Sequence, residues 1–299
     1  MKTYLCFLLT LILCLVEIEL MAQATFKHAV YIGVDGMGTY GIPNAETPHM
    51  DTLIQNGVLL QGQAVLPTKS GPNWTSLLNG VDSDTHGVKT NSWRITDIQD
   101  SVFCGGEKGE RIPTIFRAIR DQYPNANTAL FHDWPNIRRY VERDVSTVQA
   151  GGKDEDITTF LTVSYLEKYQ PMFSFIHLDH VDIAGHEAGH KTPIYYQAVE
   201  KADSLIGEII AATKRAGMYE STLFVIISDH GGIGKSHGGD TLEETSIPIL
   251  ISGGRAKVKT DSRDIRSFDI PPTILKALGV NIPSCWEGKP LPMVYDVDK

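Results

Sequence analysis

Cysteine is scarce in this sequence, which excludes a fold held together mainly by disulfides. The 299 residues include four cysteines. Cys6 and Cys14 lie in an N-terminal segment that we expect to be removed. The remaining two, Cys104 and Cys285, could pair in an oxidising compartment, but two cysteines do not make a scaffold. A chain of this length can instead bury a large hydrophobic core.

Positive charge is also limited and is not concentrated anywhere. The chain has 27 Lys and Arg against 36 Asp and Glu, so its formal net charge is −9. A protein that binds duplex nucleic acid needs a basic surface to neutralise phosphates, and no stretch of Lys and Arg forms one. Duplex nucleic acid is therefore not an expected partner.

Internal repeats, low-complexity tracts and domain linkers are absent too, which favours a single domain.

Long apolar runs are absent except at the N-terminus. There, Lys2 precedes an apolar run from Tyr4 to Val16, and small or polar residues follow at 21–24. This is the layout of a secretory signal peptide. Glu17 and Glu19 interrupt the apolar run, which is shorter than the ~20 residues that span a bilayer, so we expect no stable membrane anchor.

These features predict a signal peptide over residues 1–24 and a single domain over residues 25–299, exported to the periplasm or secreted. A lipid-modified N-terminus at Cys14 is the minor alternative. Leu11, Ile12 and Leu13 before it lack the small residue that such processing needs.

Short apolar runs rich in β-branched residues alternate with helical patterns along the chain. Strands are predicted at Ala29–Val34, Thr128–Phe131, Met172–Leu178, Thr222–Ser228 and Ile247–Ser252. Helices are predicted at Pro48–Asn56, Pro72–Asn79, Pro113–Asp121, Asp154–Tyr169, Ile194–Ala216 and Pro271–Leu278. Several helices begin with Pro and end near Gly, as helices commonly do. The alternation predicts an α/β fold with a mostly parallel central sheet and helices on both faces.

Acidic and imidazole side chains follow three of the predicted strands. They are Asp35 after the first strand, Asp182 after the third, and Asp229 with His230 after the fourth. In open α/β sheets, ligands bind at the carboxyl ends of the strands. A single Asp there is as often a turn residue or a helix cap. Three such strand ends with neighbouring histidines indicate a shared site.

Two further histidines fit the same site. His186 lies four residues after Asp182, so one helical turn brings both side chains to the same side. His237 follows His230 through a Gly-rich segment that can fold back toward the same point. Carboxylate oxygens and imidazole nitrogens suit zinc, and two metal ions ~3.5–4 Å apart can clamp the attacking and leaving oxygens of a phosphoryl displacement. The residues suffice for two divalent cations, and we expect zinc.

Ser70 supplies the nucleophile that this chemistry needs. It lies just before the predicted helix at Pro72, and a helix N-terminus favours an anionic phosphate. Metal coordination lowers the pKa of a hydroxyl toward the alkoxide. On local evidence alone, Ser70 is equally well explained as an N-cap.

Taken together, these residues resemble the alkaline phosphatase superfamily and, within it, the type I phosphodiesterase and nucleotide pyrophosphatase branch. The matching segments run in the family's order and are specific as a set. They are Gly33–Met37, Glu46–Leu53, Pro67–Asn73, His86–Val88, Asp182–His186 and Ser228–Gly231.

The resemblance implies an alkaline-phosphatase-like fold and a metal-dependent phosphoric ester hydrolase acting on a small phosphate-ester substrate. It implies that one metal ion is held by Asp35, Ser70, Asp229 and His230, and the other by Asp182, His186 and His237. It further implies that Ser70 forms a covalent phospho-enzyme. Asn73 would donate a hydrogen bond to a non-bridging phosphate oxygen, although an Asn near a helix start is also commonly structural.

The sequence leaves several alternatives open. The branch usually has Thr where this chain has Ser70, so a phosphomonoesterase is the first alternative to a phosphodiesterase. We expect a diester, because a monoester dianion needs extra positive charge and no Arg lies near a ligand motif. A sulfatase is less favoured, because Trp74 stands where the sulfatase signature has Arg and the histidines suit zinc better than calcium. A non-catalytic binding protein has no support, since all seven ligand positions are filled. The oligomeric state is not readable from the sequence.

Residues beside these motifs are predicted to support the site. Three are expected to orient metal ligands or to pack: His177, Asp179 and His180. Lys69 and Lys235 are candidates for phosphate contacts, although an exposed Lys is usually just solvated. The segments 91–93 and 132–134 are candidates for lining the substrate pocket, with core packing favoured for Trp93 and Trp134.

Overall fold

The computed structural model describes residues 26–97, 110–254, 257–260 and 264–296, so the predicted signal peptide over residues 1–24 lies outside the described residues. The strands are β1 (His28–Val34), β2 (Gly57–Gln63), β3 (Thr128–His132), β4 (Val148–Gly151), β5 (Phe173–Leu178), β6 (Thr222–Ile227), β7 (Ser246–Gly253), β8 (Lys257–Lys259), β9 (Ile265–Arg266) and β10 (Val294–Asp296). The α-helices are α2 (Pro48–Gln55), α3 (Ser70–Asn79), α4 (Ser83–His86), α5 (Ile115–Gln122), α6 (Glu155–Tyr169), α7 (His180–Ala188), α8 (Pro193–Arg215), α9 (Leu242–Thr245) and α10 (Ile270–Ala277). Short 3-10 helices are η1 (Ile42–Asn44), η2 (Ile95–Asp97), η3 (Pro135–Arg139), η4 (Tyr219–Ser221) and η5 (Ser267–Asp269).

Within the described residues, eight strands form one sheet in the order β4-β3-β5-β1-β6-β7-β2-β9. Strands β4, β3, β5, β1 and β6 are parallel neighbours. Strand β7 runs antiparallel to both β6 and β2. The predicted α/β fold with a mostly parallel central sheet is confirmed.

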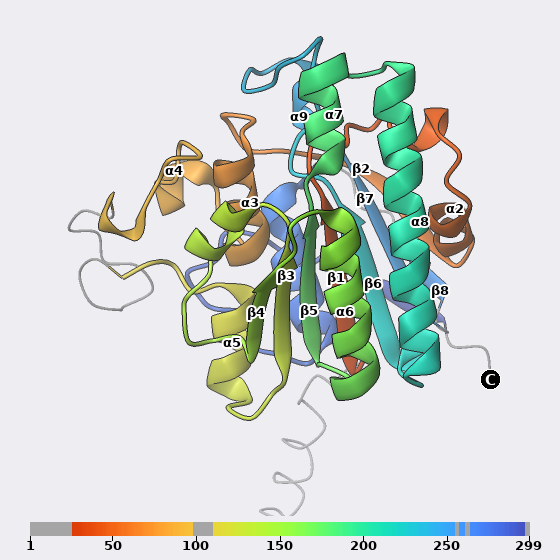
Figure 1. The fold of residues 1–299 in the computed structure, drawn as a ribbon. Helices are drawn as coiled ribbons and strands as arrows, with labels where there is room; N and C mark the ends of the chain where they lie inside the picture. The colour runs from red at the N-terminus through yellow and green to blue at the C-terminus, as the bar shows by residue number, and fades with distance from the viewer. Residues whose placement is uncertain (1–25, 98–109, 255–256, 261–263, 297–299) are drawn as a thin grey trace, which may run out of the picture.

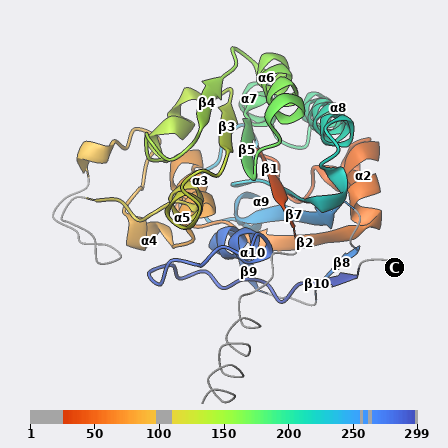
Figure 2. The ribbon, with the colours of Figure 1, turned by 90° about the horizontal axis from the view of Figure 1, so that it is seen from below.

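Both faces of the sheet are buried, as the apolar strand sequences require. Along β1, Ala29 and Tyr31 point to a core shared with α3, α5 and α10, whereas Val30 and Ile32 point to a core shared with α2, α6 and α8. Successive side chains of a strand face opposite sides, so a strand covered on both faces must be apolar throughout. Figure 2 shows the two groups of helices on opposite sides of the sheet.

All five predicted strands and all six predicted helices are present, and their ends differ from the prediction by no more than two residues. Strand β2 was not predicted, because it has one β-branched residue, Val58, and two glycines, and much of the strand is exposed. Helix α7 was anticipated only as the single turn that joins Asp182 to His186.

The sheet order explains where the polar side chains collect. Strands β5, β1 and β6 are adjacent and parallel, so their carboxyl ends lie at the same edge. Helix α7 directly follows β5, and Figure 1 shows α7 and α9 beyond this upper end of the sheet. Asp35 after β1 and Asp229 after β6 therefore lie beside the start of α7.

Two expectations concerning cysteines and the membrane can be compared with the structure. Cys285 is disulfide-bonded, while Cys104 lies outside the described residues. Across the described ranges, none of the helices combines the length and the apolar character needed to cross a bilayer.

Candidate active site

Asp35 lies at the centre of a hydrogen-bonded group at the end of β1. Its carboxylate is fully buried. Oδ2 accepts a hydrogen bond from the Trp74 indole at 2.8 Å and lies 3.0 Å from Nε2 of His177. Oδ1 faces the other way and lies 3.5 Å from both Ser70 Oγ and His230 Nε2. One oxygen of Asp35 is thus fixed by its neighbours, and the other faces the nucleophile.

Asp35, Asp229 and His230 form the first cluster that can hold a metal ion, with ligand atoms within 4.8 Å of one another. Oδ1 of Asp229 accepts from the Gly36 amide at 3.2 Å, whereas its buried Oδ2 has no hydrogen-bond partner. Burial, followed by the charges of Asp35 and Asp182, raises the pKa of Asp229 well above its usual range. A cation between these carboxylates would remove that repulsion.

Ser70 lies beside this first cluster. It is the first residue of α3, so the helix begins two residues earlier than predicted. Its hydroxyl lies 3.3 Å from Nε2 of His230, and only 5% of the residue is exposed. Lys69 occupies the N-cap position, so the alternative role of Ser70 as an N-cap is wrong.

Asp182, His186 and His237 form the second cluster. Nε2 of His186 lies 3.2 Å from Oδ2 of Asp182, which confirms the predicted contact across one helical turn. Nε2 of His237 lies 3.7 Å from the other oxygen, Oδ1, which is buried without a hydrogen-bond partner. The hydrogen bond with Asp182 raises the pKa of His186 to about 9. Burial opposes the change at Asp182, but His186, His230 and His237 lower the pKa of this carboxyl to about 2.

The two clusters are neighbours. The rings of His230 and His237 stack with centroids 3.8 Å apart. Gly36 has φ +69°, and a Cβ there would lie 2.7 Å from Oδ1 of Asp182, so only glycine lets the chain after Asp35 pass this close. Each cluster has a buried carboxylate oxygen that lacks a hydrogen bond but lies near an imidazole Nε2: Asp229 Oδ2 is 3.2 Å from His230, and Asp182 Oδ1 is 3.7 Å from His237. Such converging oxygen and nitrogen atoms fit two divalent cations.

A second layer of residues holds Asp35 in place. His177 bridges Asp35 and Asp133, because its Nδ1 lies 3.1 Å from Oδ1 of Asp133. Burial alone would lower the pKa of His177, but the two carboxylates raise it well above its usual range. Oδ2 of Asp133 accepts a hydrogen bond from the Asp179 amide. His177 therefore orients a candidate ligand, as expected, and Asp133 is a supporting residue rather than a pocket-lining one.

Asn73 does not occupy the place that the sequence predicts for it. Its side chain is completely buried, its amide nitrogen donates to the carbonyls of Val65, Pro67 and Lys69, and its Oδ1 accepts from the Val65 amide. All of these partners belong to the loop before α3. The structure therefore assigns Asn73 to fixing that loop rather than to a phosphate contact.

Asn91 is the amide that lies beside the nucleophile. Its Oδ1 accepts a 2.7 Å hydrogen bond from the backbone amide of Gly71, the residue after Ser70. Asn91 was predicted only as part of a segment that lines the pocket, because 20 residues separate it from Gly71. No local pattern links the two positions.

Tyr140 is a further residue that the sequence did not single out. Its hydroxyl is buried and has no hydrogen-bond partner among the described residues. A Cβ on Gly71 would lie 2.6 Å from this hydroxyl oxygen, so the ring reaches the first turn of α3. Trp93 and Trp134 each pack against Tyr140 with ring centroids 6.2 Å apart, in agreement with the packing role favoured for both.

The two candidate lysines differ. Nζ of Lys235 donates to the carbonyl of Glu187, so this side chain caps the end of α7 instead of facing the clusters. Lys69 extends toward the loop that carries His237, because its Cε would lie 3.4 Å from a Cβ at Gly238. Lys69 thus stays a candidate for a phosphate contact.

A family model described as "Type I phosphodiesterase / nucleotide pyrophosphatase" matches residues 29–243. The chain belongs to the type I phosphodiesterase/nucleotide pyrophosphatase family. The match includes every candidate ligand as well as Ser70, so the family assignment and the two clusters concern the same part of the chain.

Curated proteins with related sequences are 26–28% identical to the chain where they align. The bis(5′-adenosyl)-triphosphatase of Bos taurus is 26% identical over 225 residues, which cover 70% of this chain and 48% of that protein. A GPI ethanolamine phosphate transferase 2 of Aspergillus fumigatus is 28% identical over 181 residues, or 54% of this chain and 21% of that protein. The chain thus spans about half the length or less of these two curated relatives.

Solved structures share the fold. A murine ectonucleotide pyrophosphatase/phosphodiesterase 5, an inactive variant in complex with AMP, superposes with a TM-score of 0.68 at 15% identity and covers 86% of this chain and 96% of its own. A 2-O glycosaminoglycan sulfatase gives the same TM-score at 14% identity and covers 89% of this chain and 73% of its own. The phosphodiesterase family fold is therefore shared with sulfatases, as expected for the alkaline phosphatase superfamily.

Proposed function

We propose that this chain is an exported phosphodiesterase/nucleotide pyrophosphatase that uses two zinc ions and a phospho-Ser70 intermediate. The observation that carries the proposal is the position of Ser70. Its hydroxyl lies within 3.5 Å of both Asp35 and His230, at the start of a helix and beside a second Asp/His cluster. Export rests on the predicted signal peptide over residues 1–24, and residues 25–299 are proposed as a single catalytic domain.

The residues would divide the work as follows. Asp35, Ser70, Asp229 and His230 would hold one cation and Asp182, His186 and His237 the other. Two cations held there would supply positive charge that favours loss of the Ser70 hydroxyl proton to solvent and offsets charge on the phosphate oxygens. Ser70 Oγ then forms a bond to phosphorus while the bond from phosphorus to the leaving oxygen breaks, and the leaving oxygen keeps the electron pair. Water later cleaves the Ser70 phosphoester and restores the hydroxyl.

The hydrogen bonds around Ser70 suit this role. The amide of Gly71 is occupied by Asn91, so Asn91 lies where its side-chain amide can also donate to a phosphate oxygen next to Ser70. His177 keeps Asp35 in one orientation, and the backbone carbonyls of Lys235 and Thr68 fix the rings of His186 and His237. Such outer hydrogen bonds commonly fix the ring orientation of metal ligands.

A diester or a nucleotide anhydride is the proposed substrate class, with a phosphomonoesterase as the alternative. The relatives named bis(5′-adenosyl)-triphosphatases and the structural neighbour with bound AMP support a nucleotide substrate. The sequence argument that no Arg lies near a ligand motif needs correction, because Nη1 of Arg139 donates to the carbonyl of Asn91 at 3.4 Å. The preference for diesters therefore rests on the family and on the neutral Asn91.

The test uses purified mature protein that is dialysed against a chelator and then reloaded with zinc. We expect zinc to restore hydrolysis of bis(4-nitrophenyl) phosphate, at a rate that exceeds hydrolysis of 4-nitrophenyl phosphate after correction for the uncatalysed rates. A clear preference for the monoester would favour the phosphomonoesterase and leave the two-metal site intact. Complete inactivity toward both esters would favour a binding protein.

A further inference from the structure

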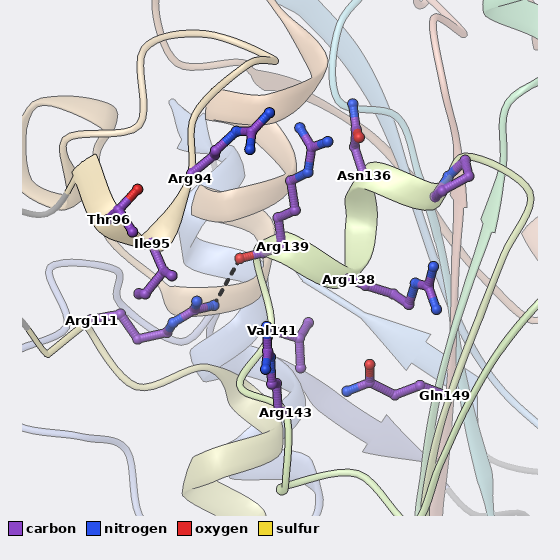
Figure 3. A pocket seen from close by; sticks show the side chains of 11 residues that line it. Arg94, Ile95, Thr96, Arg111, Asn136, Arg138, Arg139, Val141, Arg143 and Gln149 are labelled. Atoms are coloured by element: carbon purple, nitrogen blue, oxygen red, sulfur yellow. Dashed lines mark hydrogen bonds between the residues drawn. The ribbon is translucent and has the colours of Figure 1, made fainter.

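A cavity of about 650 Å³ lies outside the two metal clusters and is lined by arginines. Five arginine side chains contribute to it: Arg94, Arg111, Arg138, Arg139 and Arg143. Figure 3 shows these side chains around the cavity, with the guanidinium groups of Arg94 and Arg139 extending in the same direction. We call this cavity the arginine pocket.

The concentration of positive charge here is unusual for this protein. The whole sequence contains 11 arginines and has a net charge of −9, yet five of the arginines line one cavity. Within the described ranges, the ion pairs of the molecule do not include any of the five. The nearby Glu142 carboxylate accepts hydrogen bonds from the backbone amide and hydroxyl of Thr114. Glu142 is near enough to interact electrostatically with Arg111, whereas the other four guanidinium groups form no ion pair within the described part of the chain.

The pocket shares a wall with the proposed active site. Arg139 lies at the end of η3 and donates to the carbonyl of Asn91 at 3.4 Å. The side chain of Asn91 in turn accepts from the amide next to Ser70. Helix η3 also directly follows Asp133 and Trp134, which contact His177. Two successive contacts therefore connect a pocket arginine to Gly71, the residue after the nucleophile.

Hydrogen bonds and aromatic contacts hold part of the pocket wall in place. Nη1 of Arg111 donates to the carbonyl of Arg139 at 3.0 Å, and its guanidinium lies over the Trp93 ring at 5.8 Å. Trp93 packs on Tyr140, the residue after η3. Two of the five arginines are thus held by backbone and aromatic contacts, while Arg94, Arg138 and Arg143 are exposed and able to meet a ligand.

The chemistry of the pocket points to a phosphate group. A guanidinium donates two parallel hydrogen bonds to phosphate oxygens, and several guanidinium groups around one cavity suit a group with more than one negative charge. The scissile diester phosphate would be bound by the metal clusters and carries a single charge. We propose that the arginine pocket binds a second phosphate group of the substrate. This inference rests on the proposed function.

The test removes the three exposed arginines together, as Arg94→Ala, Arg138→Ala and Arg143→Ala in one chain. These substitutions leave the contacts of Arg111 and Arg139 with the backbone in place. The matched control removes three positive charges elsewhere on the surface: Arg117→Ala, Lys201→Ala and Arg215→Ala, each of which forms an ion pair outside the pocket.

Three substrates report on the pocket. Bis(4-nitrophenyl) phosphate has a single phosphate with one negative charge. ATP has two further phosphates, which lie in the leaving group. The 4-nitrophenyl ester of thymidine 5′-phosphate that also bears a 3′-phosphate has its second phosphate on the nucleoside. We expect the pocket variant to lose about tenfold or more in kcat/KM on at least one of the two polyanionic substrates, mainly through KM. Its kcat/KM for bis(4-nitrophenyl) phosphate should stay within about twofold of the parent, and the control variant should behave like the parent on all three.

The outcomes separate the two proposals. Equal kcat/KM losses on all three substrates, or no loss on any, would overturn the second phosphate site while the phosphodiesterase function stands. If the zinc-loaded parent enzyme hydrolyses none of the three, the proposed function is wrong, and so is the second phosphate site that depends on it. A loss on ATP alone would place the second phosphate in the leaving group, and a loss on the 3′-phosphorylated ester alone would place it on the nucleoside.

Discussion

The Nε2 atoms of His186 and His237 lie 3.1 Å apart, and each also lies near a different oxygen of Asp182. Their Nδ1 atoms donate in the opposite direction, to the backbone carbonyls of Lys235 and Thr68. Two imidazole rings turned by backbone hydrogen bonds toward one carboxylate form a preorganised three-ligand site.

This relationship predicts that both histidines are required for the second metal ion. Zinc-loaded parent protein should contain about two zinc ions per chain, and His186→Ala or His237→Ala should contain about one, with activity lower by about 100-fold or more. Metal content by atomic emission and kcat with bis(4-nitrophenyl) phosphate check this. The exposed His49, which lies on α2, provides the control His49→Ala. A parent protein with one calcium and no zinc would disprove the two-zinc site.

Ser70 should be indispensable for chemistry but not for holding both metals. Because its hydroxyl is the only proposed covalent nucleophile, Ser70→Ala should lower kcat by about 10³-fold or more while zinc content stays near that of the parent. Ser70→Thr should keep part of the activity, since it keeps a hydroxyl. The exposed Ser204 on α8, in Ser204→Ala, serves as a matched control. A Ser70→Ala enzyme within about tenfold of the parent would show that water attacks phosphorus directly.

Asp133 should matter through His177 and Asp35. Asp133→Asn removes the carboxylate charge that orients His177 and raises its pKa, so the carboxylate of Asp35 loses part of its support. Outer residues of metal sites typically contribute about 10- to 100-fold in affinity or activity, and we expect a loss in this range. Zinc titrations and kcat measurements check it, with Asp121→Asn on the exposed end of α5 as the control. Unchanged zinc affinity and kcat would mean that Asp35 needs no such support.

Substitution by Ala should mainly lower stability at Asn73 and mainly lower kcat at Asn91. Asn73→Ala leaves several buried backbone groups without partners, so we expect about 2–3 kcal/mol or more of lost stability, seen as a lower Tm. Asn91→Ala breaks one hydrogen bond, for a loss of about 1 kcal/mol, but should lower kcat by about 100-fold if its amide contacts the phosphate. Thermal unfolding and kinetics on both variants decide the matter. An Asn73→Ala protein with an unchanged Tm and a low kcat would restore the phosphate contact predicted from the sequence.

His86 should make the protein sensitive to acid. Burial, assisted by Lys89, lowers the pKa of His86 from 6.5 to about 3. Its Nδ1 accepts from the Val88 amide and its Nε2 donates to Ser76, so the folded protein holds the neutral ring and has no place for a second proton.

The unfolded chain binds a proton at His86 below pH 6.5, whereas the folded protein resists it down to pH about 3. Above pH 6.5, His86 therefore causes no loss in the free energy of unfolding. Below that pH, its preference for the neutral form lowers the free energy of unfolding by up to about 1.4 kcal/mol per pH unit. Tm measured from pH 7.5 to 4 should decline less steeply in His86→Gln than in the parent. Parallel Tm curves for the two proteins would show that His86 does not titrate this way.

Local sequence determined the framework of this protein. Apolar β-branched runs predicted the five strands that build most of the sheet, because a strand covered on both faces must be apolar along its whole length. The ligand residues could be grouped as well, since Asp35 and Asp229 lie just after strands whose carboxyl ends meet at one edge. The spacing of Asp182 and His186 placed both on one side of a helix, as the structure has them.

Only the tertiary structure decided which residues surround Ser70 beyond that framework. Asn73 is near Ser70 in sequence, yet its side-chain amide bonds to the loop before α3. Asn91 accepts a hydrogen bond from Gly71, next to Ser70, although 20 residues separate Asn91 from Gly71. Arg139 meets Asn91 across 48 residues of sequence and brings the arginine pocket to the same wall. These contacts depend on the paths of loops between helices and strands. Local patterns of polarity and propensity do not encode such paths, because loops meet only after the sheet and its helices have packed.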